Sequence, residues 1–159
     1  MIQRIQSIYL LVAGLLLFGL FLFPYVHYND LLGLGKDVKV TGVYGVSAGQ
    51  PVHEGGFLYI LQTIVTVVVG LLPIFIIFKY KNRKTQIKLV FLNIFLVVLL
   101  AVGLYVNAGN HLSTVNQFLG ASNIGVGFFL LPVSIILLAL ALGGIRRDEK
   151  LIKSADRLR

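Results

Sequence analysis

Long runs without a charged residue constrain this chain more than any other feature of its sequence. No Asp, Glu, Lys or Arg occurs between Arg4 and Asp30, between Glu54 and Lys79, or between Lys88 and Arg146. About 20 apolar residues are enough to cross the hydrocarbon core of a bilayer. Only 13% of the residues are charged and 57% are hydrophobic, whereas roughly 25% are charged in soluble domains. The sequence therefore predicts an integral membrane protein.

The runs divide into four predicted spans. The last run is longer than one crossing can use, and its middle, NAGNHLSTVNQFLGASN, is polar and rich in turn-forming residues, so it splits in two. We expect an all-α membrane protein of one domain over 1–159, a four-helix transmembrane bundle. The predicted spans cover about 5–26, 56–78, 89–106 and 124–145, with outer loops over 27–55 and 107–123, an inner link over 79–88 and an inner tail over 146–159.

The positions of the cations predict the orientation. Of the 14 basic residues, Lys36 and Lys39 fall in the first outer loop. The other twelve lie at the N-terminus, in the link and in the tail: Arg4, Lys79, Lys81, Arg83, Lys84, Lys88, Arg146, Arg147, Lys150, Lys153, Arg157 and Arg159. By the positive-inside rule, both termini are expected in the cytoplasm. The cations of the link and the start of the tail are expected to meet anionic lipid headgroups, so the basic excess does not indicate a nucleic-acid partner.

Two segments outside the spans look structured. The stretch VKVTGVYGVSAG alternates apolar with small or polar residues and predicts a small outer β-hairpin that turns near Thr41 and Gly42. The tail predicts an amphipathic C-terminal helix on the inner membrane surface, with docking to a cytoplasmic partner as the alternative. The apolar face of this helix comprises Leu151, Ile152, Ala155 and Leu158.

Few residues of this sequence are candidates for catalysis or for metal binding. The absence of cysteine excludes disulfides, thiolate nucleophiles and cysteine-held metals, and the absence of charge inside the spans disfavours ion-coupled transport. The three histidines, His27, His53 and His111, fall in the predicted outer loops, on the same side as Asp30, Asp37 and Glu54. They are candidates for a metal site, or for a haem held by His27 and His111, but no pair has the i, i+4 spacing of ligands on one helix. We therefore expect no catalytic residue, cofactor or metal.

Neutral polar residues and prolines interrupt the spans. Gln62 and Asn93 are expected to form hydrogen bonds between helices. A shared ligand cavity is the alternative, but the two residues lie near opposite ends of neighbouring spans. Pro73 and Pro132 lack a backbone donor and are expected to kink their helices. A small-residue pair in the last span, at 139 and 143, allows close helix approach within the bundle or between protomers.

Three segments carry a resemblance to a known family. The opening MIQRIQSIYLL, the link YKNRKTQIKLVFLNI and the closing RRDEKLIKSADRLR resemble an uncharacterised family of short four-span inner-membrane proteins of Bacteroidota, domain of unknown function number 4293. The similarity extends over essentially the whole chain. It implies a multi-pass protein of a bacterial inner membrane, and it brings no known activity, cofactor or catalytic residue.

These observations favour a non-enzymatic scaffold or accessory subunit of a membrane assembly, with a protein partner or a second copy of the chain. The first alternative is a binder or transporter of a small hydrophobic molecule, a lipid or a quinone, between spans kinked at Pro73 and Pro132. The second alternative is an enzyme or metal site that uses the histidines and carboxylates of the outer face.

Overall fold

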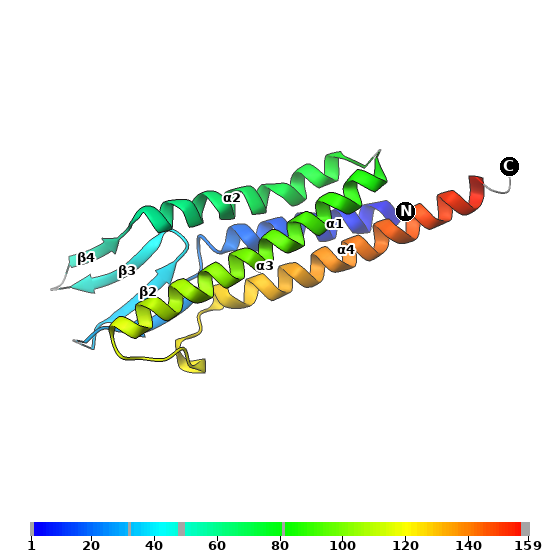
Figure 1. Ribbon diagram of the computed structural model, residues 1–159. Helices are drawn as coiled ribbons and strands as arrows, with labels where there is room; N and C mark the ends of the chain where they lie inside the picture. Colours follow the sequence, from blue (N-terminus) through cyan, green and yellow to red (C-terminus); the bar gives the residue numbers. More distant parts are fainter. Residues whose placement is uncertain (1, 32, 48–49, 81, 157–159) are drawn as a thin grey trace.

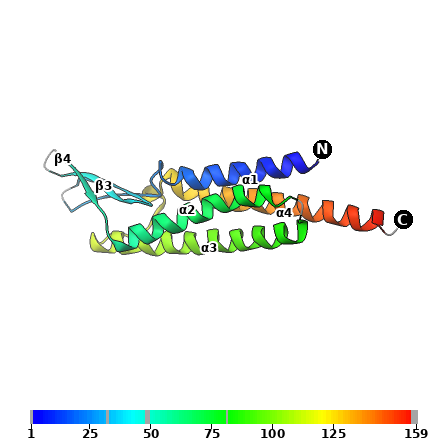
Figure 2. The same cartoon turned by 90° about the horizontal axis from the view of Figure 1, so that it is seen from above.

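Four helices lie side by side in an elongated bundle that carries a small β-sheet at one end (Figure 1). The structure is a computed structural model and describes residues 2–31, 33–47, 50–80 and 82–156. The helices are α1 (Ile2–Gly19), α2 (Phe57–Phe78), α3 (Arg83–Thr114) and α4 (Val126–Asp156), with a 3₁₀ turn, η1 (Ala121–Asn123), before α4. Figure 2 shows both chain ends and the α2–α3 link at the end of the bundle away from the sheet. We call the two ends the sheet end and the terminal end.

Three helices of the described chain are long and apolar enough to cross a membrane: α2, α3 and the Val126–Ile152 part of α4. The apolar stretch of α1, Ile5–Gly19, is shorter. Many large apolar side chains on the outside of these helices are exposed, as expected where lipid and not water surrounds the bundle. The coarse prediction of a mostly helical protein with membrane-type helices is therefore confirmed.

The helices approach one another closely where small residues face each other. Leu10, Ala13 and Leu17 of α1 are fully buried at helical spacing. A Cβ atom at Gly14 would lie 3.1 Å from the backbone oxygen of Gly70 in α2, so glycine lets α1 and α2 pack backbone against backbone. Van der Waals packing of this kind stabilises helix pairs in lipid, where burial from water contributes little.

The first helix is shorter than the predicted span over 5–26. It ends at Gly19, and the chain continues in turns to Pro24, which lacks the N–H group that an α-helix requires. The backbone N–H of Tyr25 then donates to the oxygen of Val38 at 2.9 Å, so the chain is already part of the sheet. The predicted span is therefore not one continuous helix, because an apolar run does not show where a helix gives way to a buried strand.

The sheet has four antiparallel strands in the order β1 (Val26–Asn29), β2 (Gly35–Lys39), β3 (Gly42–Ser47) and β4 (Gln50–Glu54). The predicted hairpin and its turn are confirmed in β2 and β3, whose last pair is Lys39 with Gly42. The prediction was incomplete because β1 and β4 extend the hairpin on both sides. Gly42 has φ +154°, and a Cβ there would lie 2.7 Å from the backbone oxygen of Glu54, so the turn requires glycine.

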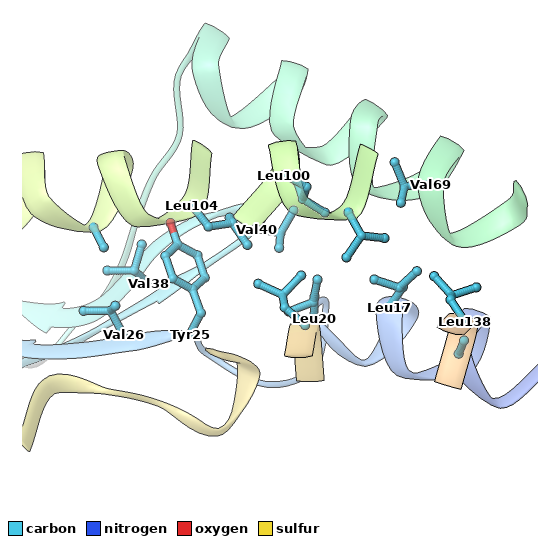
Figure 3. Close-up of a cluster of buried hydrophobic side chains, with 14 of the residues drawn as sticks. Leu17, Leu20, Tyr25, Val26, Val38, Val40, Val69, Leu100, Leu104 and Leu138 are labelled. Carbon is cyan, nitrogen blue, oxygen red and sulfur yellow. The ribbon is translucent and has the colours of Figure 1, made fainter. Parts of the chain in front are cut away.

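The buried face of the sheet packs against the ends of the helices. Figure 3 shows Tyr25 directed toward α3, among buried residues that include Val38, Val40 and Leu104. This packing explains why α3 continues to Thr114 and does not end near 106, where the outer loop was predicted. Its residues Leu104, Ala108 and Leu112 are buried at i, i+4 spacing, which favours helix even within a polar stretch.

The tail is also different from its prediction. Helix α4 continues without interruption from Val126 to Asp156, so the described tail is the end of a long helix and not a separate surface helix. Residues 145–156 contain no glycine or proline, and most of them are good helix formers. Figure 1 shows this last part of α4 projecting beyond the other helices.

Candidate functional site at the sheet end

Five side chains lie together where the sheet meets the helices and form hydrogen bonds in two sets. We call them the junction cluster: Tyr25, Tyr59, Gln62, Asn107 and His111. Asn107 Nδ2 donates to the Tyr25 hydroxyl at 3.2 Å and to Gln62 Oε1 at 3.1 Å. The Tyr59 hydroxyl forms a further hydrogen bond with His111 Nε2. The cluster thus joins the residue before β1 to the first turns of α2 and the last turns of α3.

Helix periodicity brings these groups together. Tyr59 and Gln62 are three residues apart on α2, and Asn107 and His111 are four apart on α3, so each pair shares a helix face. The His111 ring lies against Tyr59 and also against Tyr28 of β1, with ring centres 5.9 and 6.4 Å away. Burial raises the pKa of Tyr28 above its ordinary value. Tyrosines at helix ends are typical of the level where lipid headgroups begin.

Two amides of the bundle have unused hydrogen-bonding capacity. Gln62 Nε2 is buried and has no partner among the described residues, although Gln62 Oε1 accepts from Asn107. Asn93, midway along α3, is fully buried, and neither its Nδ2 nor its Oδ1 has a partner in the described part of the chain. The predicted hydrogen bond between helices is therefore confirmed for Gln62 and is absent for Asn93 within the described chain.

A charged network lies on the sheet beside the junction cluster. Lys36 Nζ of β2 is 3.2 Å from Asp30 Oδ2 and 3.3 Å from Glu54 Oε1. Burial works to lower the pKa of Lys36, but the hydrogen bonds with both carboxylates outweigh it, so this pKa lies above its ordinary value. The Leu31 N–H, 2.7 Å from Asp30 Oδ1, and then Lys36 lower the pKa of Asp30. A Cβ at Gly45 would lie 2.9 Å from Lys36 Cγ, so this glycine lets Lys36 cross β3.

A groove runs between α2 and α3 next to the junction cluster, and we call it the α2–α3 groove. Its volume is about 390 Å³. Most of its lining is apolar, and its polar residues are the amides Gln62, Asn107 and Asn110. The apolar lining comprises Leu58, Leu61, Val65, Leu99, Leu100, Gly103, Leu104 and Val106. An apolar cavity with a few convergent polar groups is the usual form of a small-molecule site.

A second, polar pocket of about 540 Å³ lies between β1, β2 and the loop before α4. In it, His27 Nδ1 and Asp37 Oδ1 are 2.5 Å apart. Asn123 Nδ2 donates to the His27 backbone oxygen at 3.1 Å, and Gln117 Nε2 donates to that of Asn29 at 3.2 Å. The loop is thereby fixed to β1 at two points.

The three candidate metal ligands have separate partners. His27 contacts a carboxylate of β2, the His53 ring lies 4.6 Å from the Tyr44 ring, and His111 bonds the tyrosine of α2. The described residues contain no group of three or more His, Cys, Asp and Glu side chains that could hold a metal ion. The fold therefore does not bring the three histidines together into one site.

The predicted contact residues of the link and the tail lie at the terminal end. One of them, Arg83, turns toward Asp148, with 3.7 Å between Arg83 NH1 and Asp148 Oδ2. The others whose side chains are described are exposed: Lys79, Lys84, Lys88, Arg146, Arg147, Leu151 and Ile152. Lys81, Leu158 and the side chain of Ala155 lie outside the described residues. Contact of this surface with anionic lipid or a partner stays a prediction.

A contact between α1 and α4 at the terminal end was not predicted from the sequence. Gln6 Nε2 of α1 donates to Asp148 Oδ2 of α4 at 2.9 Å, and the Asp148 side chain is only 9% exposed. A Cβ at Gly144 would lie 2.8 Å from Gln6 Cγ, so glycine makes room for the amide. From the sequence, Asp148 is expected to be an exposed residue of the tail, because its partner lies near the opposite end of the chain.

The two prolines lie within continuous helices. Pro73 is buried in α2 and Pro132 is exposed on α4, and both helices extend well beyond them. Neither proline lines the α2–α3 groove. The predicted kinks stay a prediction.

Comparison with known proteins identifies the family. The chain belongs to the family described as Domain of unknown function (DUF4293), whose family model matches residues 2–158. The resemblance drawn from the two ends and the link is thereby confirmed, while the four crossings and the Bacteroidota source stay predictions. None of the curated proteins matches this chain. Family membership and the apolar helices together indicate a membrane protein.

Proposed function

We propose that this protein is a non-enzymatic scaffold or accessory subunit of an assembly in a bacterial inner membrane, and that its sheet end contacts a protein partner. Phe118 carries the proposal. Its side chain is 93% exposed, the highest fraction among the large apolar residues of the described chain. Aromatic side chains are the most frequent anchors at protein interfaces.

The surroundings of Phe118 form a firm platform. Gln117 and Asn123, on either side of it in the loop, are hydrogen-bonded to the backbone of β1. Elsewhere at the sheet end, Leu31 in the turn after β1 and Val46 of β3 are also exposed. An anchor held by a fixed loop binds at a lower entropic cost than one on a flexible segment. This arrangement supports binding of a partner at the sheet end more than catalysis there.

The packing of α1 against α4 supports four membrane crossings. Near the terminal end, Gln6 lies beside Gly144, and near the sheet end, Pro24 lies beside Gly125. The segment from Gln6 to Pro24 thus covers the same height of the bundle as the segment from Gly125, just before α4, to Gly144. As helix, this second segment is about as long as the 30 Å hydrocarbon core is thick. We therefore infer that α1 and the turns after it form the remaining crossing.

Charge supports the proposed orientation, with both termini in the cytoplasm. Lys36 and Lys39 lie on β2 at the sheet end. The basic residues of the link and of α4 lie at the terminal end, where Arg83 and Gln6 both contact Asp148. A bundle with this asymmetry is expected to insert with the terminal end in the cytoplasm.

Crosslinking in native membranes tests the partner. We expect crosslinks from residues 116–123 of the wild-type chain to a reproducible protein partner, and their loss in Phe118→Ala because the anchor is removed. Phe78→Ala is the matched control, since Phe78 is equally apolar and highly exposed at the terminal end of α2. A Phe118→Ala variant with the same crosslinked partners as the wild type would contradict the proposal.

Cysteine accessibility tests the orientation, because the chain has no cysteine of its own. Ser122→Cys and Ser154→Cys place single thiols at exposed positions of the sheet end and the terminal end. We expect a membrane-impermeant thiol reagent to label Ser122→Cys in intact cells with a permeabilised outer membrane, and Ser154→Cys only after the inner membrane is broken. The reverse pattern, or labelling of both in intact cells, would rule out the orientation.

The α2–α3 groove favours a second candidate function, the binding of a small hydrophobic molecule. Its apolar walls and three amides fit such a ligand. Lipid extracted from the purified protein and identified by mass spectrometry tests it: a lipid or quinone retained in a fixed ratio to protein is expected, and loss of all lipid without loss of fold would contradict it.

A further inference from the structure

The shape of the α2–α3 groove limits what can occupy it. On α3 the groove extends from Leu99 to Asn110, which is about 16 Å of helix at 1.5 Å per residue. The volume of about 390 Å³ spread over this length gives a mean cross-section of about 24 Å². An α-helix about 10 Å across needs about 80 Å². The enclosed part of the groove is therefore much narrower than a helix, and its width suits one hydrocarbon chain.

The polarity of the groove changes along its length. Its three amides, Gln62, Asn107 and Asn110, lie toward the sheet end, whereas Val65, Leu99 and Leu100 continue the lining toward the middle of the bundle. No charged residue lines the groove among the described residues. This order matches an amphiphile that lies parallel to the helices, with uncharged oxygen atoms at the sheet end and its chain in the bundle.

Two details of the lining favour a specific occupant. A Cβ at Gly103 would meet no atom within 4 Å, so the wall of the groove is open there and room remains for a chain. Asn110, at the sheet end of the lining, is exposed, so its side-chain amide can donate a hydrogen bond to a carbonyl oxygen at the mouth of the groove.

We propose that the α2–α3 groove binds one acyl chain of a glycerophospholipid from the leaflet at the sheet end, with the ester carbonyl accepting a hydrogen bond from the amides at its mouth. The tyrosines of the junction cluster lie at the same level, where aromatic residues meet the headgroup region and the ester groups of lipids lie. This inference names the ligand of the second candidate function, and it is independent of the protein partner at Phe118.

Photo-crosslinking in lipid nanodiscs tests the proposal. The probe is a phosphatidylethanolamine that carries a diazirine in one acyl chain, and mass spectrometry locates the labelled residues. For the wild type we expect labelling concentrated on the groove. For Gly103→Leu we expect a several-fold loss of this labelling, because the added side chain occupies the open space and leucine is favourable in a helix.

Gly143→Leu is the matched control. Gly143 lies exposed on α4, and a Cβ there also meets nothing within 4 Å, so the same substitution adds the same side chain to the lipid-facing surface. We expect its labelling to equal that of the wild type. Circular dichroism of both variants shows that they are folded. Labelling spread evenly over the lipid-facing helices, or equal labelling of Gly103→Leu and Gly143→Leu, would overturn the proposal while leaving the scaffold function standing.

Two further probes test the head of the ligand. An ether-linked phosphatidylethanolamine with the same diazirine lacks the ester carbonyl, and we expect it to label the groove several-fold less than the ester-linked probe. Equal labelling by the two probes would overturn the assigned hydrogen bond. An isoprenoid quinone in excess is expected to leave the phospholipid label in place; if it displaces that label, the occupant is a quinone and the phospholipid assignment is wrong.

Discussion

Replacement of Asp148 by alanine should loosen the terminal end of the bundle. Gln6, which is only 6% exposed, would lose the acceptor of its 2.9 Å hydrogen bond, and a buried donor without a partner costs about 1–3 kcal/mol. Arg83 should add little, because its side chain is partly exposed and 3.7 Å from the carboxylate. We therefore expect Asp148→Ala to lower the free energy of unfolding by about 2 kcal/mol.

The matched variant is Asp148→Asn, which removes the charge but keeps an oxygen for the Gln6 amide. It should cost well under half as much, about 0.5 kcal/mol, because only the weak attraction to Arg83 is lost. The assay is equilibrium unfolding by sodium dodecyl sulfate in mixed micelles, followed by circular dichroism. Heating is a second readout, in which about 2 kcal/mol corresponds to a decrease of about 4–8 °C in Tm for a chain of this size.

A double-mutant cycle with Gln6→Ala decides whether the loss comes from this contact. Because the two side chains are in direct contact, their substitutions should be coupled, so the double variant loses less stability than the sum of the single variants. Equal losses in Asp148→Ala and Asp148→Asn, or strictly additive effects of Gln6→Ala and Asp148→Ala, would refute the reasoning.

Three further predictions concern the sheet end. Gly125→Ala places a Cβ 2.3 Å from the Pro24 backbone oxygen, so we expect a loss of about 1–3 kcal/mol from overpacking, measured by the same unfolding assay; unchanged stability would contradict the packing. The lowered pKa of Asp30 stabilises the sheet above the ordinary carboxyl pKa of about 4, and this contribution disappears as the pH falls through the lowered value. The raised pKa of Lys36 contributes below about pH 10 and is lost as the pH rises through the raised value. The protection of the strands against hydrogen exchange, relative to the unfolded chain, should therefore fall at both extremes. Asp30→Asn should abolish the acid side and weaken the alkaline side, because Asp30 is one of the two carboxylates that raise the pKa of Lys36. Tyr59→Phe removes the hydroxyl group that bonds its histidine partner and should lower the free energy of unfolding by about 0.5–1.5 kcal/mol. An unchanged free energy of unfolding in the same assay would contradict a stabilising hydrogen bond.

The helices were predictable because their apolar content is so high, but their ends were not. Residues 107–114 look like a loop by composition, yet Leu104, Ala108 and Leu112 form a buried stripe that continues α3 against the sheet. Such a stripe predicts that the helix continues only when the sheet that it packs against is known. In the same way, β1 could not be separated from the end of the first apolar run, since Tyr25 and Val26 are as apolar as the helix before them.

The candidate site was predictable in part. Gln62 stands out as a polar residue in a span, and its hydrogen bond to another helix was expected. Asn107 was assigned to a loop, so its place opposite Gln62 depends on the unforeseen extension of α3. Asp148 and Gln6 are 142 positions apart in the sequence, and no local pattern predicts that they meet. Periodicity identifies which face a residue occupies, whereas its partner is decided by how whole helices pack.

The length of α4 sets how far the chain stands out of a bilayer. Its 31 residues measure about 46 Å, roughly 16 Å more than a hydrocarbon core of about 30 Å. At the sheet end, Gly125 and Gly127 touch the backbone around Pro24 so closely that no Cβ would fit, so the start of α4 is fixed against the rest of the protein. In the proposed topology, the surplus emerges at the opposite end, beginning near Arg146. The last turns of α4 then continue the spanning helix beyond the membrane surface, and the length of this helix determines how far from the membrane a bound partner lies.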